Sequence, residues 1–141
     1  MQVKYLIIHC TATAQGKDFT AADVDRWHRA QGWKCIGYHY LIRLDGTIEQ
    51  GRPETQVGAH CAGVNSISLG ICYVGGLAPD GRTPRDTRTI QQKAALLALL
   101  RRLKKKYPQA RILSHHHFNS HKACPSFDAD TEYARLGDDA S

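Results

Sequence analysis

The sequence lacks any apolar run long enough to cross a membrane. Within its 141 residues, no stretch approaches the roughly 20 apolar residues that a spanning helix needs. The apolar run near the N-terminus, Tyr5 to Cys10, is shorter than the hydrophobic region of a secretory signal and ends in a histidine and a cysteine. We therefore expect a protein made in the cytoplasm, with no export signal of its own and no membrane partner.

Paired cysteines are also missing. The five cysteines form no Cys-x-x-Cys pair, which argues against a structural zinc site of the Cys₄ or Cys₂His₂ kind. An odd number of cysteines without a signal argues against a disulfide framework, so reduced thiols are expected. Cys10, Cys35 and Cys72 lie among apolar residues and are interpreted as small core side chains.

No internal repeat, low-complexity segment or linker interrupts the chain. One domain is expected over residues 1–136, followed by a polar tail at 137–141. The net charge of +6 favours an anionic partner, either nucleic acid or a cell wall with acidic polymers. Much of the excess lies at 101–106, where basic residues at the end of a helix complement the helix dipole on a solvated face.

The pattern of apolar residues predicts an α/β single domain with a mixed central β-sheet flanked by helices. Helices are expected from Thr20 to just before Gly32, from about Thr87 to Tyr107, and over a short segment after Phe127. Strands are expected at Val3–His9, Gly37–Leu44, Thr47–Gln50, Ser68–Val74 and Arg111–Ser114.

Three local signals support this assignment. Thr20 and Asp23 have the spacing of a capping box. The pair Asp45-Gly46 is typical of a hairpin with a two-residue turn. The long helix carries one apolar stripe, which is formed by Leu96, Leu99, Leu100 and Leu103.

The segment 115–125, His-His-His-Phe-Asn-Ser-His-Lys-Ala-Cys-Pro, is the most unusual part of the chain. Imidazole and thiolate are the natural ligands of Zn²⁺. Since this segment follows a predicted strand, a strand end and a loop can aim two ligands at one ion, and His9 at another strand end can supply a third. Three ligands leave a position open for water, as in catalytic sites. The alternative is a solvent-facing polar loop.

In this light, the chain resembles the type-2 N-acetylmuramoyl-L-alanine amidases, and within them a short phage branch, with the peptidoglycan-recognition proteins as more distant relatives. The resemblance runs from about Tyr5 to Phe127 with its motifs in order. These motifs are Ile8-His9-Cys10-Thr11-Ala12-Thr13, Trp27-His28, Gln31-Gly32-Trp33, Gly37-Tyr38-His39-Tyr40, Asp45-Gly46-Thr47, Val57-Gly58-Ala59-His60, Gly70-Ile71-Cys72-Tyr73-Val74-Gly75-Gly76 and Lys122-Ala123-Cys124-Pro125-Ser126-Phe127.

The resemblance implies one catalytic zinc ion in a surface groove, held by His9, His116 and Cys124. In the family the second histidine precedes the cysteine by eight residues, which selects His116 among three consecutive histidines. A strand also alternates its side chains, so that His115 and His117 are expected to point away from His116. His121 stands where relatives often have proline and is a spare candidate ligand.

The same resemblance implies roles for other side chains. Tyr38 would hold or deprotonate the attacking water, and Lys122 would stabilise the oxyanion of the tetrahedral intermediate. His60 and Asn65 lie where the family lines its substrate groove and are candidate contacts to peptide or sugar. His39 and His28 are interpreted as structural. One departure is Phe118, which stands where many relatives have an acidic residue near the metal.

The implied function is hydrolysis of the amide bond between N-acetylmuramic acid and L-alanine in bacterial peptidoglycan. The expected partner is peptidoglycan, and the expected form is a monomer that works as an endolysin on the cell wall after release. A recognition module without catalysis is disfavoured because Tyr38 and Cys124 are present. A nucleic-acid binder with structural zinc explains the charge but not a three-ligand site beside a tyrosine and a lysine. A regulatory protein partner, known in the phage branch, leaves no motif here.

Overall fold

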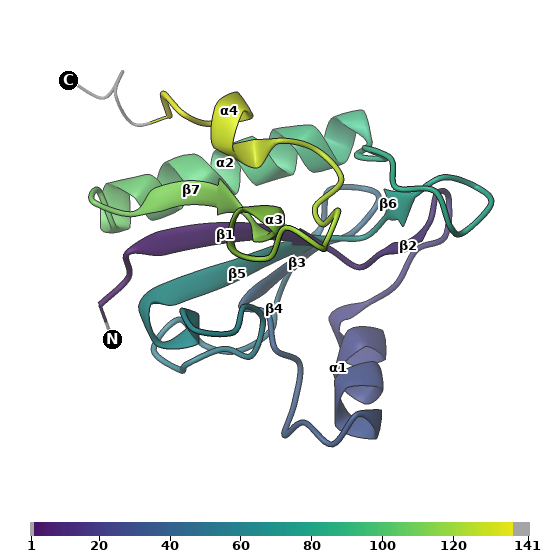
Figure 1. Ribbon diagram of the computed structural model, residues 1–141, viewed down its shortest axis with the longest axis horizontal. Helices are drawn as coiled ribbons and strands as arrows, with labels where there is room; N and C mark the ends of the chain where they lie inside the picture. The colour runs from purple at the N-terminus through teal and green to yellow at the C-terminus, as the bar shows by residue number, and fades with distance from the viewer. Residues whose placement is uncertain (1, 137–141) are drawn as a thin grey trace.

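The computed structural model describes residues 2–136, which form a central sheet with helices packed against it (Figure 1). The predicted polar tail, 137–141, lies outside the described residues. The helices are α1 (Ala21–Ala30), α2 (Ile90–Lys106), α3 (His115–Phe118) and α4 (Ala129–Glu132), with a 3₁₀ turn, η1, at Asn65–Ile67. The strands are β1 (Tyr5–Cys10), β2 (Thr13–Ala14), β3 (Tyr40–Ile42), β4 (Ile48–Gln50), β5 (Ser68–Tyr73), β6 (Gly76–Leu77) and β7 (Arg111–Ser114).

The main sheet is mixed, as the sequence predicts. Its strand order is β4-β3-β5-β1-β7. β1 lies between β5 and β7 and runs parallel to both, whereas β4 pairs antiparallel with β3. β2 and β6 form a separate parallel pair beside it. Because β1, β5 and β7 are parallel, their carboxyl ends meet at the same edge of the sheet.

Both long helices begin at a capping box, and the sequence predicts the first of them. Thr20 and Asp23 form the predicted capping box of α1. For α2 the box is formed by Thr89 and Gln92, so the helix begins later than the expected Thr87. Thr87 belongs instead to the preceding loop, where its hydroxyl accepts a hydrogen bond from the Gly76 amide at 2.8 Å.

The hairpin between β3 and β4 has a longer turn than predicted. The Arg43 amide donates to the Thr47 carbonyl at 2.9 Å, and the Gly46 amide donates to the Arg43 carbonyl at 2.9 Å. This bonding leaves three loop residues, with Gly46 at φ +89° in the last position. A glycine in the left-handed region is the usual last residue of such a three-residue loop. The prediction of a two-residue turn was therefore wrong.

The two faces of the sheet pack against different helices, as Figure 1 shows. The leucine stripe of α2 packs on one face, where it meets alternate residues of β1 such as Leu6 and Ile8. On the other face Val24 of α1 packs against Leu41 and Cys72. Since side chains alternate along a strand, His9 of β1 points away from α2.

A buried arginine ties the C-terminal segment to this framework. The Arg88 side chain is 1% exposed and forms ion pairs with Asp86 at 2.9 Å and Glu132 at 2.8 Å. It also donates to the Tyr133 hydroxyl at 2.9 Å, and its guanidinium lies 3.4 Å from the centre of the Phe127 ring. Fork-shaped guanidinium donors suit two carboxylates at once. The segment that follows the histidine-rich loop is therefore held in place.

Within residues 2–136, no helix is both long and apolar enough to cross a membrane.

Candidate active site

Two histidines meet at the carboxyl edge of the sheet. His9 lies near the end of β1 and is 1% exposed. His115 follows β7 directly. Ile8 of β1 is paired with Ser114 of β7, so His9 and His115 are each the next residue along two parallel neighbouring strands. Their ring centres are 4.4 Å apart. Parallel strands thus bring together residues that are far apart in the sequence.

A loop returns Cys124 to the same place. The Cys124 Sγ lies 3.9 Å from His9 Nδ1 and accepts a hydrogen bond from the Cys10 amide at 3.2 Å. The loop is fastened on both sides, since the Tyr73 hydroxyl donates to the Pro125 carbonyl at 2.6 Å and the Ser126 hydroxyl donates to the Gly76 carbonyl at 2.8 Å. The thiol position is therefore set by the neighbouring strands.

The donors of His9, His115 and Cys124 suit a metal ion. One ligand atom from each residue lies within 4.8 Å of the others. The Nδ1 atom of His115 is buried. Among the buried side-chain nitrogen and oxygen atoms of residues 2–136, it is the one that has no hydrogen-bond partner. An unpaired buried polar atom is costly unless something binds it. Two imidazoles and a thiolate are a zinc donor set with room for a fourth ligand.

The second histidine of this group differs from the prediction, which named His116. The structure places His116 with Asp128 and Asp130 instead. The strand ends at Ser114 and the chain enters α3, so the alternation expected of a strand does not extend over the three histidines. Between α3 and Cys124 the chain makes a tight turn, in which the Lys122 amide donates to the Asn119 carbonyl at 3.0 Å.

The two aspartates near His116 have hydrogen-bond partners within the chain, which explains their positions without a metal ion. Asp128 caps α4 by accepting from the Thr131 amide at 3.2 Å and the Thr131 hydroxyl at 2.6 Å. Asp130 accepts from the Ser114 amide at 2.6 Å and pairs with His117 Nδ1 at 2.7 Å. Asp130 therefore fixes the turn after β7, and Asp128 fixes the start of α4.

The surroundings keep the site's imidazoles neutral. Burial lowers the pKa of His9 well below its ordinary value, and the charges of His60 and His115 lower it further. Burial followed by the positive charge of Lys122 lowers the pKa of His115. Neutral imidazole is the form that binds metal, so these two donors are ready to bind at neutral pH.

Tyr38 lies beside the histidines, just before β3. Its ring centre is 5.1 Å from that of His9. Removal from water, together with the neighbouring Cys72 and Cys124 thiols, raises the pKa of Tyr38 well above its ordinary value. The phenol therefore keeps its proton at neutral pH, which suits holding a water by hydrogen bonds better than removing its proton.

Lys122 is an exposed residue in the turn that leads to Cys124. Its positive charge acts on the site: after burial, it contributes most to lowering the pKa of His115. An exposed lysine at this edge thus adds positive charge beside the histidines.

His60 and Asn65, which were expected to contact substrate, have hydrogen-bond partners within the chain. His60 is 8% exposed and lies inside the site, where its Nδ1 is 2.9 Å from Nε2 of His9. The Asn65 side-chain oxygen accepts from the amides of His60 and Cys61, each at 2.9 Å, and so shapes the loop. His39 is structural, as predicted, because its Nδ1 accepts from the Gly70 amide at 3.0 Å.

A glycine makes room for His60, and sequence reasoning missed it. A Cβ at Gly70 would come within 2.7 Å of the His60 ring. His60 therefore lies flat on β5 next to β1, which only a glycine at that position allows. The signal in the sequence was a glycine inside an otherwise apolar strand.

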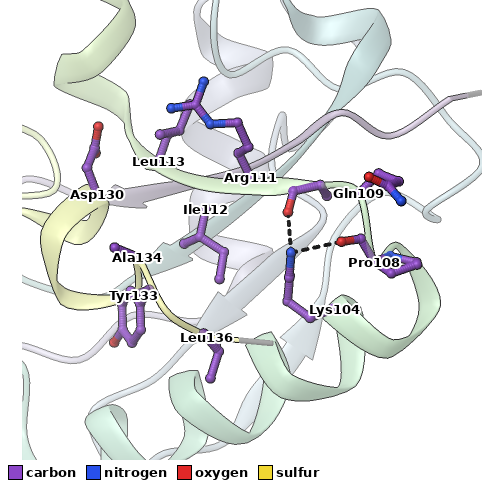
Figure 2. A pocket seen from close by; sticks show the side chains of 11 residues that line it. Lys104, Pro108, Gln109, Arg111, Ile112, Leu113, Asp130, Tyr133, Ala134 and Leu136 are labelled. Carbon is purple, nitrogen blue, oxygen red and sulfur yellow. Dashed lines mark hydrogen bonds between the residues drawn. The ribbon is translucent and has the colours of Figure 1, made fainter. Parts of the chain in front are cut away.

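Figure 2 shows a pocket at a different place, between the end of α2, β7 and the α4 segment. Lys104 Nζ donates there to the carbonyls of Pro108 and Ala110, at 3.1 and 2.7 Å, which closes the turn into β7. Its lining contains none of His9, His115 and Cys124.

The sequence matches the model of one protein family, N-acetylmuramoyl-L-alanine amidase, over residues 1–127. It is 43% identical over 127 residues to the endolysin of Enterobacteria phage K11, which covers 90% of this chain and 83% of that protein. It is 42% identical over 123 residues to the endolysin of Escherichia phage T7, with 87% of this chain and 80% of that protein covered.

The fold has solved counterparts as well. The N-acetylmuramoyl-L-alanine amidase LysC from Clostridium intestinale superposes with a TM-score of 0.80 at 32% identity, covering 96% of this chain and 84% of that one. Family model, relatives and fold agree over nearly the same residues. The chain therefore belongs to the N-acetylmuramoyl-L-alanine amidase family and is an enzyme that acts on peptidoglycan.

Proposed function

We propose that the enzyme is zinc-dependent, with His9, His115 and Cys124 as the ligands. The observation that carries this proposal is the buried, unpaired Nδ1 of His115, which lies within 4.8 Å of donors from the other two residues. A zinc ion bound there supplies Lewis-acid polarisation of the scissile carbonyl and lowers the pKa of a water molecule. All three ligands come from one chain, which agrees with action as a monomer.

The chain's own residues divide the remaining work. Tyr38, whose pKa is raised by removal from water, holds the attacking water through its hydroxyl. Lys122 offers its ammonium group to the oxyanion that forms when water adds to the lactyl carbonyl. Collapse of that intermediate breaks the bond to L-alanine, and the leaving amine takes up the proton that the attacking water gives up. The products are a lactyl carboxylate on the glycan and a free stem peptide.

We further propose that this chemistry serves cell-wall lysis. The K11 and T7 relatives are endolysins that align with most of this chain. The net charge of +6 favours contact with acidic wall polymers, and that attraction weakens with salt.

Removal of the metal tests the proposal. Purified peptidoglycan treated with the enzyme is expected to release stem peptides with an amino-terminal alanine, identified by mass. A chelator is expected to stop the release and added Zn²⁺ to restore it, because the carbonyl loses its Lewis acid. Mg²⁺ at the same concentration is the control, since it prefers oxygen ligands. Full activity in protein shown to be free of metal would contradict zinc dependence.

A further inference from the structure

A chain of hydrogen bonds runs from His9 into the interior behind the metal ligands. His9 Nε2 lies 2.9 Å from His60 Nδ1, and both rings are buried. His60 Nε2 lies 3.3 Å from the Ser68 hydroxyl. That hydroxyl donates in turn to the Val64 carbonyl at 2.7 Å. The chain thus ends on a backbone oxygen, which can only accept.

The end of the chain fixes the position of every proton in it. Ser68 has a single hydroxyl proton, which goes to Val64, so its oxygen accepts from His60. His60 then carries its proton on Nε2, and its Nδ1 is an acceptor. It follows that His9 carries its proton on Nε2 and has its lone pair on Nδ1. That Nδ1 is the atom 3.9 Å from Cys124 Sγ.

The surroundings of His60 hold its ring in place. The hydrogen-bond geometry calls for a neutral ring, because a protonated one would present two donors and no acceptor to His9. The ring lies against Gly70, where a Cβ would come within 2.7 Å, and Asn65 holds the His60 amide.

From this geometry we infer that His60 and Ser68 are positioning residues for the metal site. They act through His9, by holding its proton on Nε2 and aiming the Nδ1 lone pair at the ion. The inference rests on the proposed zinc site and gives His60 and Ser68, which lie outside the group of candidate ligands, a role that acts through His9. Partners of this kind orient metal-binding histidines and raise their basicity.

Zinc affinity of matched variants tests the inference without any assay of activity. His60→Leu removes the acceptor for His9, and its zinc affinity, measured by competition with a coloured chelator, is expected to fall about 10- to 100-fold. His60→Asn keeps an acceptor near the Nδ1 position and is expected to recover part of this loss. Ser68→Ala leaves the ring space intact and is expected to weaken zinc binding less than His60→Leu does.

A control separates this effect from general loss of stability. Gln92 is buried on the α2 side of the sheet, and its amide donates to the carbonyls of Ile42 and Val74. Gln92→Leu removes these buried hydrogen bonds and the Gln92 half of the α2 capping box, on the opposite side of the sheet from His9. The zinc affinity of this variant is expected to stay within about twofold of wild type. Gln92 and the metal site share no hydrogen-bond partner, and changes at such sites act independently. Circular dichroism establishes that each variant is folded.

The proton positions can be seen directly in the zinc-loaded wild type. Nitrogen-15 spectra of the imidazole rings are expected to show His9 and His60 both protonated on Nε2. The inference is overturned if His9 carries its proton on Nδ1, or if folded His60→Leu binds zinc as tightly as wild type. Either result leaves zinc dependence standing. A wild type that binds no zinc would instead overturn the proposed function itself.

Discussion

Replacing His115 by alanine is expected to lower kcat/KM for peptidoglycan by at least about 100-fold. Loss of a residue that only hydrogen-bonds to a metal ligand already costs up to about 100-fold, and loss of a ligand is expected to cost at least as much. The physical reason is that the buried Nδ1 of His115 has no other partner and is placed to bind the ion with His9 and Cys124. The measurement is stem-peptide release at several substrate concentrations, with zinc content determined on the same samples. Zinc content is expected to fall together with activity.

The matched control is the neighbouring histidine. His116→Ala changes the same kind of side chain one residue away, but the structure groups His116 with Asp128 and Asp130. This variant is expected to keep zinc and most of its activity. The opposite pattern, with His116→Ala inactive and His115→Ala active, would restore the ligand that the family spacing selected.

Replacing Lys122 by methionine is expected to lower kcat by about 100- to 1000-fold, as removal of an oxyanion partner does. KM is expected to change little, because the oxyanion exists only in the transition state. Zinc content is expected to stay at the wild-type level, since lysine is not one of the ligands. Steady-state kinetics on soluble muropeptides separates the two parameters.

Lys105 supplies the comparison for this substitution. It is exposed in the last turn of α2, on the far side of the sheet from His9. Lys105→Met removes the same charge and is expected to leave kcat unchanged. If Lys122→Met raises KM and leaves kcat at the wild-type value, Lys122 binds substrate and transition state equally and has no role in the chemical step.

Sequence periodicity was sufficient for most of the fold. Short apolar runs became β1, β5 and β7, and the leucine stripe of α2 is buried as expected. The pattern missed the pair β2–β6, whose two-residue strands are too short to show a period, and the short α3, which lies in a segment interpreted as a loop. The hairpin turn was mistaken by one residue, since Asp-Gly fits both the shorter and the longer loop.

The sequence was sufficient to predict two of the three candidate metal ligands. His9 and Cys124 were expected from residue type and family spacing, and the structure brings them together. Selecting among three consecutive histidines required knowing where β7 stops. That point depends on tertiary contacts, such as the hydrogen bond from the Ser114 amide to Asp130, which no local pattern reveals.

His60 shows a second limit of sequence reasoning. A histidine in a glycine-rich loop resembles a surface contact, and only the pairing of strands shows it packed on Gly70 beside His9. Phe118, the expected departure from the family's pattern, packs on Tyr5 with ring centres 5.2 Å apart. His9 is contacted by His60.

X-ray absorption at the zinc edge of the wild-type enzyme tests the proposed metal site most directly. The expected spectrum has one sulfur neighbour at about 2.3 Å and nitrogen or oxygen neighbours at about 2.0 to 2.1 Å, with one zinc ion per chain. This pattern corresponds to Cys124 with the two imidazoles of His9 and His115. A spectrum with nitrogen and oxygen neighbours but no sulfur would contradict it and would place the ion elsewhere, such as beside His116, Asp128 and Asp130.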